Sequence, residues 1–397
     1  MTTSNGSVSL SPGPDTPATA ARPWAPLITL LKYGLGFGLL AVLIWNNWKP
    51  GNPDGLAALW NKYVVEGHPI NGTALVLAFV VCVAAIVLTF VRWYVLVRAQ
   101  ELPFTLMSAL RLGLIGNALN VLLPGSIGGD VAKAACIARE QSRRTVAVAT
   151  VLIDRAIGLW ALFWFVVILG SAFWALGWLH GETEATLHSI ILGAAGLVAG
   201  TMLVWLLLGV LPKRRAERFA GRLEGIPKVG HSAAEFWRAV WMYRLKGRSI
   251  ALALGLSLIG HVGFMFTFYL AARTIFPAEQ VPTLVEHLLI VPIGGLAEAS
   301  CPTPNGIGGG EAAYSGLYAL MGKPGRNGGT ACFVKRVIYW LPALVGYIVY
   351  LRMRSDMLAA EKECQAGESA APALIPRSSP ILPRPLSSDV RPPTSDL

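Results

Sequence analysis

The sequence predicts an all-α integral membrane protein with about six to eight transmembrane helices. Of its 397 residues, 54% are hydrophobic and only 14% are charged, whereas a soluble domain carries about 25% charged residues. Apolar runs of about 18 or more residues, the length that crosses the hydrocarbon core of a bilayer, recur along the chain. So much apolar surface cannot be buried inside one water-facing globule, and a bilayer is the solvent that accepts it.

The N-terminal part of the chain combines a polar tail with two predicted spans. Residues 1–23 are rich in Ser, Thr, Pro and Ala, which predicts a disordered tail and argues against a signal peptide. A membrane domain is predicted over residues 24–355, and its first spans cover residues 27–45 and 73–91. Arg92 directly follows the second span and is interpreted as its interfacial end.

The next apolar segment, residues 106–140, is interrupted in its middle. Pro124 lacks a backbone N–H donor, and Gly125, Gly128 and Gly129 permit non-helical backbone. Unpaired backbone groups are costly in lipid, so we expect the break to lie against protein or a wet cavity. The segment is therefore predicted to be a broken or re-entrant hairpin.

Four further spans and a second broken segment are predicted. The four spans cover residues 156–176, 187–211, 249–271 and 333–351. Asp154 and Arg155 directly precede the first of them and are placed at its entry. A basic loop over residues 212–248 carries ten Lys and Arg against three Glu, and the second broken segment covers residues 284–321. Residues 356–397 are predicted to be a disordered, Pro-rich tail.

The two broken segments resemble each other and form a possible internal repeat. Residues 124–130 read PGSIGGD and residues 304–311 read PNGIGGGE. With the basic loop 212–248 in the cytoplasm and the acidic loop 180–186 outside, the hairpins enter from opposite sides and both termini are cytoplasmic. Such opposed segments are typical of inverted repeats, whose substrate site lies near the midplane. Six full spans result, or eight if the broken segments also cross.

Several charged residues border the predicted breaks. Asp130 and Lys133 lie three residues apart and share a helix face, either as a polar pair at a headgroup or as an interfacial salt bridge. Arg155 is a candidate bidentate phosphate ligand or an interfacial topology residue. Glu311 is expected to balance Arg155 or Arg336, to carry a proton, or to complement a helix dipole. Backbone N–H groups at the start of each half-helix favour an anion such as phosphate.

Short motifs follow one another in a fixed order between about residues 27 and 351. They consist of Asn117, Asn120, Leu123, Pro124, Gly125, Gly128, Gly129 and Asp130, then Asp154, Arg155 and Gly158, and finally Pro304, Gly306, Gly308 and Glu311. In these motifs the chain resembles the membrane region of the lysylphosphatidylglycerol synthases and related flippase-like membrane proteins. The resemblance implies the lipid-translocating part without the cytoplasmic synthase domain, because only about 45 residues follow the last predicted span.

The chain also departs from the pattern of that family. Lys133 stands where the family often has Arg, and Asp154 stands where it often has Glu. In the second motif Asn305 and Gly310 replace a Gly and an Arg, which leaves open which anionic group this motif binds.

The predicted function is movement of a lipid with an anionic headgroup, or of a polyprenyl phosphate, between the leaflets of a bacterial cell membrane. The candidate substrate-binding residues are Asn117, Asn120, Pro124, Gly125, Gly128, Gly129, Asp130, Lys133, Asp154, Arg155, Pro304, Gly306, Gly308, Glu311 and Arg336. No cofactor, metal site or catalytic residue is predicted, because the five Cys form no CxxC pair and no DxD pair or His cluster occurs. Nucleic-acid binding is not expected, since the basic residues border apolar runs.

Two alternatives remain beside translocation. The chain is either a non-catalytic membrane subunit that partners a lipid-modifying enzyme, or a membrane-embedded transferase acting on a lipid phosphate. Membrane lipids are the expected partners in all three cases, and the sequence predicts no oligomeric state.

Overall fold

The computed structural model of the chain describes residues 60–122, 128–178, 182–226, 230–301 and 303–370, with residues 38, 41, 45 and 57 in addition. Every regular element in this part of the chain is a helix. The chain divides into two units, Met1–Tyr350 and Leu351–Leu397, and the described part of the second unit is helical up to Ala370. The predicted all-α membrane protein is thereby confirmed.

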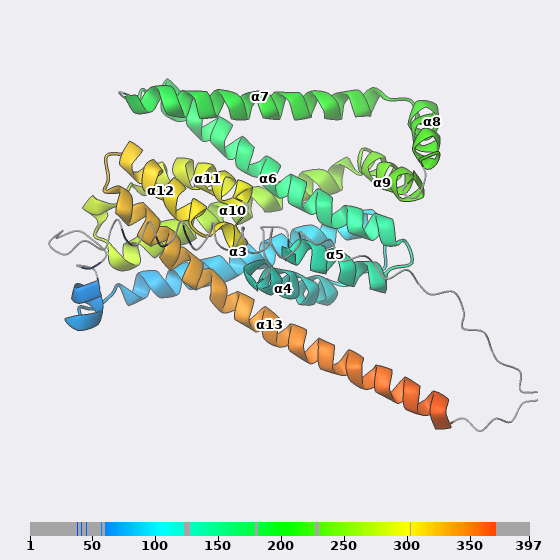
Figure 1. Cartoon of the computed structure of the whole chain (residues 1–397). Coiled ribbons are helices and arrows are strands. Elements are labelled where there is room, and N and C mark those ends of the chain that lie inside the picture. The colour runs from blue at the N-terminus through cyan, green and yellow to red at the C-terminus, as the bar shows by residue number, and fades with distance from the viewer. Residues whose placement is uncertain are drawn as a thin grey trace, which may run out of the picture. The chain divides into compact units, whose positions relative to one another are not determined.

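Five helices in the described residues are long and apolar enough to cross a membrane. They are α3 (Gly72–Ala99), α6 (Arg144–Ala175), α7 (Glu182–Val210), α10 (Gly247–Ile275) and α13 (Gly325–Ala370), labelled in Figure 1. Each of them overlaps one of the predicted spans. The first predicted span, residues 27–45, lies almost entirely outside the described residues.

Shorter helices connect and line these spans. They are α4 (Leu106–Leu122), α5 (Gly128–Glu140), α8 (Lys213–Glu224), α9 (Gly230–Tyr243), α11 (Leu284–Ser300) and α12 (Gly309–Leu320), with the single turns η1 (Asn61–Val65), η2 (Ala278–Gln280) and η3 (Pro304–Gly306). The 17 residues of α4 and of α11 extend for about 25 Å, less than the ~30 Å hydrocarbon core. These lengths favour hairpins over additional full spans.

Helices α4 and α5 form an antiparallel hairpin, called hairpin 1 here. The side chain of Asn120 accepts a hydrogen bond from the Gly129 N–H at 2.9 Å, and Gly116 lies against Lys133. A Cβ at Gly129 would collide with the Gly116 carbonyl oxygen, so the two backbones touch. The connection, residues 123–127, lies outside the described residues.

Helices α11 and α12 form a second antiparallel hairpin, called hairpin 2, joined through η3. Near its tip Gly294 lies against the ring of Tyr314. Further along, His287 Nε2 lies 2.8 Å from the Tyr318 hydroxyl, and both side chains are buried. Earlier residues of α11 therefore meet later residues of α12, as an antiparallel pair requires.

Hairpin 1 opens at one end of the bundle, which we call the Gln100 end. The Gln100 side-chain amide donates to the Ala239 carbonyl at 3.1 Å, and the Gln100 main-chain carbonyl accepts from the Arg143 guanidinium at 3.3 Å. Lys246 forms an ion pair with Glu101 at 2.7 Å, and this hydrogen bond lowers the pKa of the Glu101 carboxyl. The end of α3, the beginning of α6 and the beginning of α10 therefore meet here, and hairpin 1 is inserted between α3 and α6.

Hairpin 2 opens at the other end, which we call the Thr274 end. The Asn71 N–H, just before α3, donates to the Thr274 carbonyl at 3.0 Å near the end of α10. The Asn327 side chain, at the beginning of α13, donates to the Gln280 carbonyl at 3.0 Å. Hairpin 2 is inserted between α10 and α13, so the two hairpins enter the bundle from opposite ends, as an inverted repeat predicts.

Helix α6 begins earlier than the sequence prediction. It begins at Arg144 rather than at residue 156, so Asp154 and Arg155 lie inside the helix and not at its entry. The helix tolerates a carboxylate there because Asp154 is paired with Arg92 of α3.

Two predicted irregular segments also contain helix. The basic loop, residues 212–248, folds into α8 and α9, because α8 buries a stripe of alanines against α9. Helix α13 continues to Ala370, past the beginning of the tail predicted to be disordered over residues 356–397. The first proline of that tail is Pro372, so no helix-breaking residue precedes the helix end.

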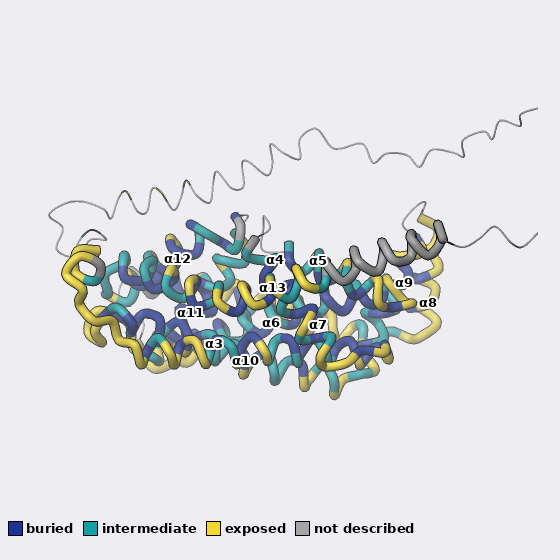
Figure 2. Tube along the Cα trace, turned by 90° about the horizontal axis from the view of Figure 1, so that it is seen from below, coloured by how far each residue is buried: buried dark blue, intermediate teal, exposed yellow. Residues whose placement is uncertain are grey.

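Small residues bring α3 and α10 close together in the middle of the bundle. A Cβ at Gly263 would lie 3.0 Å from the Ala85 Cβ, and one at Gly260 would lie 3.8 Å from the Ala85 carbonyl oxygen. Small side chains at such contacts allow tight helix packing in a bilayer. Figure 2 shows buried residues on the inward sides of the helices and exposed residues on their outer sides.

Candidate functional site

Two adjoining cavities lie between the hairpins. Cavity 1, of about 240 Å³, borders hairpin 1, and cavity 2, of about 260 Å³, borders hairpin 2. Both are lined by Asn120, Arg155, Leu162, His261, Phe264, Ala299 and Tyr339. Each volume is several times the ~30 Å³ share of one water molecule. The cavities therefore hold room for a polar group together with water.

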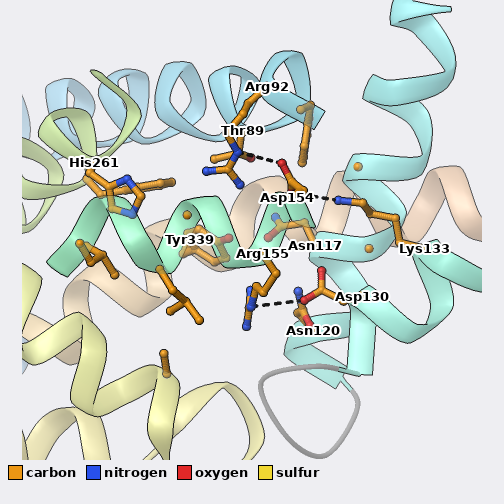
Figure 3. Close-up of a pocket in the computed structure, with 18 residues that line it drawn as sticks. Thr89, Arg92, Asn117, Asn120, Asp130, Lys133, Asp154, Arg155, His261 and Tyr339 are labelled. Atoms are coloured by element: carbon orange, nitrogen blue, oxygen red, sulfur yellow. Dashed lines mark hydrogen bonds and ion pairs between the residues drawn. The ribbon is translucent and has the colours of Figure 1, made fainter. Parts of the chain in front are cut away.

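A buried charge cluster forms one wall of cavity 1, as Figure 3 shows. Asp154 of α6 accepts from Arg92 of α3 at 2.8 Å and forms an ion pair with Lys133 of α5 at 3.5 Å. Arg92 also donates to the Ser257 hydroxyl at 2.8 Å, and the Lys133 ammonium lies 4.0 Å from the Trp93 ring centroid. Two cations therefore share one carboxylate, and the cluster carries an excess positive charge.

A second ion pair and an amide complete cavity 1. Arg155 lies 3.4 Å from Asp130, and its side chain is 39% exposed. Asn117 is buried, and its amide nitrogen has no hydrogen-bond partner among the described residues. Figure 3 shows the Asn117 side chain beside Arg155 in this pocket. An unsatisfied buried donor is costly, and an acceptor inside the cavity would satisfy it.

Cavity 2 has its own charge cluster. Glu298 of α11 forms ion pairs with Lys335 at 2.7 Å and with Arg336 at 3.2 Å, both on α13. Arg336 also pairs with Glu311 of α12 at 2.9 Å. Glu298, Lys335 and Arg336 line the cavity. The cluster therefore joins both helices of hairpin 2 to α13.

The break in hairpin 2 is built around Arg336. Its guanidinium donates to the carbonyls of Asn305 and Gly306 in η3. Asn305, Gly306 and Gly308 have φ of 49°, 67° and 83°, a region that favours Gly and tolerates Asn. Glu311 accepts from the Gly308 N–H at 2.7 Å and caps α12. The interrupted backbone is thus satisfied by side chains instead of lipid or water.

The internal space as a whole is positive. Its cations are Arg92, Lys133, Arg155, Lys335 and Arg336, and its carboxylates are Asp130, Asp154, Glu298 and Glu311. Among the described residues of the two clusters, one more cation than carboxylate is therefore present. A buried space with this imbalance favours entry of an anion.

The structure brings most of the predicted site residues together. The residues of this group that line cavity 1 are Asn117, Asn120, Asp130, Lys133, Asp154 and Arg155. Gly129 contacts Asn120, while Gly128 begins α5 without lining a cavity. Pro124 and Gly125 lie outside the described residues.

The second predicted motif lies beside cavity 2. Pro304 begins η3, Arg336 lines the cavity, and Gly306, Gly308 and Glu311 form the turn and cap around the Arg336 guanidinium. Glu311 thus contacts Arg336, one of its two expected partners.

The salt bridge that was one of two alternatives for Asp130 and Lys133 does not form between them. Asp130 and Lys133 do share a face of α5, but each pairs with a neighbouring residue of α6 instead. Lys133 contacts Asp154, and Asp130 contacts Arg155. The reason is that α6 begins earlier than expected and so places both of its charges opposite α5.

Sequence reasoning missed Arg92 and Lys335 as site residues. Arg92 was interpreted as the end of a span, yet α3 continues to Ala99 and buries it. The apolar run that follows Arg92 was the available signal. Lys335 was not among the predicted site residues, and it lies ten residues inside α13, which begins at Gly325.

Comparison with known proteins gives one match. The family model described as the lysylphosphatidylglycerol synthase TM region matches residues 30–346, a range that holds both hairpins and both charge clusters. No curated protein and no solved structure matches the chain.

Proposed function

Because the chain belongs to the family of the lysylphosphatidylglycerol synthase transmembrane region, we propose that it binds the anionic headgroup of a membrane lipid and moves that lipid between leaflets. The lipid is a phospholipid or a polyprenyl phosphate. In this proposal the chain makes and breaks no covalent bond. The headgroup enters the cavities while the acyl chains stay in the surrounding lipid.

The observation that carries the proposal is the excess positive charge around two cavities that lie between opposed hairpins. Lys133 and Arg92 share one carboxylate, and the Asn117 amide nitrogen is an unused donor beside them. A phosphate oxygen accepts a hydrogen bond from the Asn117 amide, and its negative charge balances the excess cation. A neutral solute accepts the hydrogen bond but leaves the excess positive charge unbalanced.

The shared wall of the cavities supports a transfer path. Arg155 and His261 line both cavities, so a headgroup in either one remains within the same set of side chains. Hairpin 1 opens at the Gln100 end and hairpin 2 at the Thr274 end. A headgroup held between them is therefore about midway along its path.

We further propose that the Gln100 end faces the cytoplasm of a bacterial cell, with both termini there. The basic residues of α8 and α9 follow α7 and precede α10, which begins at this end. Cytoplasmic loops retain Lys and Arg, which supports this orientation.

The test is lipid movement in proteoliposomes. Fluorescent phosphatidylglycerol, phosphatidylcholine and a polyprenyl phosphate are each followed by quenching of the label in the outer leaflet. We expect the protein to accelerate movement of at least one anionic lipid over empty vesicles, with phosphatidylcholine unaffected. Equal rates with and without protein for every anionic lipid would contradict the proposal.

A variant of Asn117 links the movement to the cavity. Asn117→Asp replaces the unused donor with an acceptor and cancels the excess positive charge. We expect movement of the anionic lipid to fall by about tenfold or more. Asn61→Asp makes the same change in η1, outside both cavities, and is expected to leave the rate unchanged.

The alternative of a non-catalytic subunit makes a different prediction. The purified chain alone would then be inactive in vesicles, and a co-purified lipid-modifying enzyme would restore an activity on lipids. The match to the membrane region of a synthase family is what supports this alternative.

A further inference from the structure

Helix α8 is a strongly basic element that the proposed transport path does not use. It begins at Lys213, directly after the lipid-facing end of α7. Val210, the last residue of α7, is 82% exposed, and Leu206 and Leu207 are also exposed. The apolar surface of α7 thus continues to its last residue, and α8 follows after the two non-helical residues Leu211 and Pro212. Figure 1 shows α8 beyond the end of α7 and next to α9.

The connection between α7 and α8 is held in place. The Arg244 guanidinium, after α9, donates to the carbonyls of Leu208, Gly209 and Leu211 at 2.8–3.0 Å. Leu208 and Gly209 lie in the last turn of α7 and Leu211 directly follows it, where main-chain carbonyls lack helical partners. Helix α8 is therefore anchored at the end of a helix that is long and apolar enough to cross a membrane.

One face of α8 is a stripe of arginines. Arg214, Arg218 and Arg222 are spaced at i, i+4 and i+8, so they lie on one face, and all three are exposed. Ala216 and Ala220 are buried on the opposite face, against α9. Like charges at this spacing destabilise a helix unless an anion lies nearby.

The acids of α8 do not supply that anion. Glu217 and Glu224 both lie toward α9, where Arg238 contacts them at 3.5 Å and 2.9 Å. These contacts raise the pKa of Arg238, chiefly through the hydrogen bond to Glu224. The arginine stripe therefore faces outward with its charge uncompensated by the acids of its own helix.

An aromatic side chain borders the stripe. Phe219 is 44% exposed, and its ring packs on Trp237 with centroids 4.7 Å apart. Arginines beside an exposed aromatic ring are typical of helices that lie in the headgroup layer. Figure 2 shows exposed residues at α8.

We propose that α8 is an interfacial helix whose arginine stripe binds the headgroups of anionic phospholipids in the leaflet at the Gln100 end. The position of α8 directly after a membrane span points to lipid as the occupant. Charge complementarity selects its anionic members, because phosphate and carboxylate headgroups draw Arg to the membrane surface. This binding is separate from occupancy of the two cavities.

The test measures lipid selectivity at the protein surface. The full chain is reconstituted in phosphatidylcholine vesicles with spin-labelled phosphatidylglycerol or spin-labelled phosphatidylcholine, and the motionally restricted fraction is compared. We expect selectivity for phosphatidylglycerol at low salt, and a fall of at least about twofold in the triple variant Arg214→Gln, Arg218→Gln, Arg222→Gln. High salt, where the Debye length shrinks to about 3 Å, is expected to abolish the difference.

Two controls separate the inference from its rivals. The triple Arg→Lys variant keeps the charge and is expected to retain selectivity. The second control removes three positive charges at the Thr274 end, in the triple variant Lys62→Gln, Lys323→Gln, Arg326→Gln. This variant is also expected to retain selectivity for phosphatidylglycerol.

Retained selectivity in the triple Arg→Gln variant, with the protein monodisperse and its helix content unchanged, would overturn the proposal. That result is also the one expected if the stripe binds an acidic protein. Lipid movement in proteoliposomes is a separate measurement from this surface selectivity. The inference and the proposed function can therefore fail separately.

Discussion

Asp154 is the residue on which the packing of three helices depends. It lies inside α6 and receives Arg92 from α3 and Lys133 from α5. A buried carboxylate is costly by itself, and removal of one partner from a buried ionic group costs more than the pair contributes. Arg155, next to it in sequence, is more exposed and contacts Asp130. We therefore expect substitution of Asp154 to affect stability and substitution of Arg155 to affect function.

Asp154→Asn is expected to destabilise the protein. The change removes the carboxylate that Arg92 and Lys133 share, so two buried cations remain without it. We expect a loss of about 3–5 kcal/mol in the free energy of unfolding. Unfolding in mixed detergent micelles of increasing denaturing-detergent content measures it. A loss under about 1 kcal/mol would show that the cluster is not structural.

Arg155→Gln is expected to act on function instead. Its ion pair with Asp130 is partly exposed, so the free energy of unfolding should change by less than about 1 kcal/mol. Loss of a charge-assisted hydrogen bond to phosphate should slow movement of the anionic lipid by about tenfold. Both quantities are measured on one preparation. A normal rate would remove Arg155 from the lipid path.

The sequence indicated which motifs gather at the cavities, but not which side chains pair. A Pro followed closely by several Gly indicates a broken backbone, so the segments around Gly129 and Pro304 were found from residue type alone. The partners of Asp154 depend on helix rotation and on where α6 begins, and a single sequence carries neither. Arg92 was missed because the predicted span ended at the first charge, although apolar residues continue after it.

At the scale of the helices, Gly129→Ala tests the contact inside hairpin 1. A Cβ there meets the Gly116 carbonyl oxygen and the side chain of Asn120, both at less than van der Waals distance. We expect α4 and α5 to separate, with a loss of about 1–3 kcal/mol in the free energy of unfolding and slower lipid movement.

The matched control is Gly193→Ala in α7. A Cβ there meets nothing within 4 Å, so the change is expected to be neutral or to stabilise the helix by up to about 1 kcal/mol. Equal stability of the two variants in the same unfolding assay would contradict the close packing of hairpin 1.

Helices were predictable where apolar composition alone defines them. The spans of α3, α7 and α10 follow from runs that only lipid accommodates. Helices α8 and α9 were not predicted, because their charged residues match a loop in composition and their helical order comes from an alanine contact between them. The predicted helix ends were placed at charged residues, so the predicted beginning of α6 lies after the observed one at Arg144.

At the scale of the whole molecule, the hairpins divide the membrane domain into two oppositely directed halves. Positive-inside counting predicted this from loop charges, and contacts at the Gln100 and Thr274 ends place the hairpin openings accordingly. Which cavity each hairpin borders was beyond the sequence, since it depends on packing across the bundle.

Accessibility to a membrane-impermeant thiol reagent tests the opposed arrangement. In a background without the native cysteines, Glu101→Cys and Lys323→Cys place single thiols at opposite ends of the bundle. We expect the reagent to label one of them from outside intact cells and the other only after the membrane is opened. Labelling of both from the same side would contradict the proposed insertion of the hairpins.

The position of Arg155 has a consequence for how the two chambers communicate. The Arg155 guanidinium lines both cavities and also forms an ion pair with Asp130 of α5. An anion that binds the Arg155 guanidinium in either cavity weakens the ion pair between Arg155 and Asp130. Binding of an anion in cavity 2 then alters a contact of hairpin 1 through rotation of the Arg155 side chain, without movement of any helix.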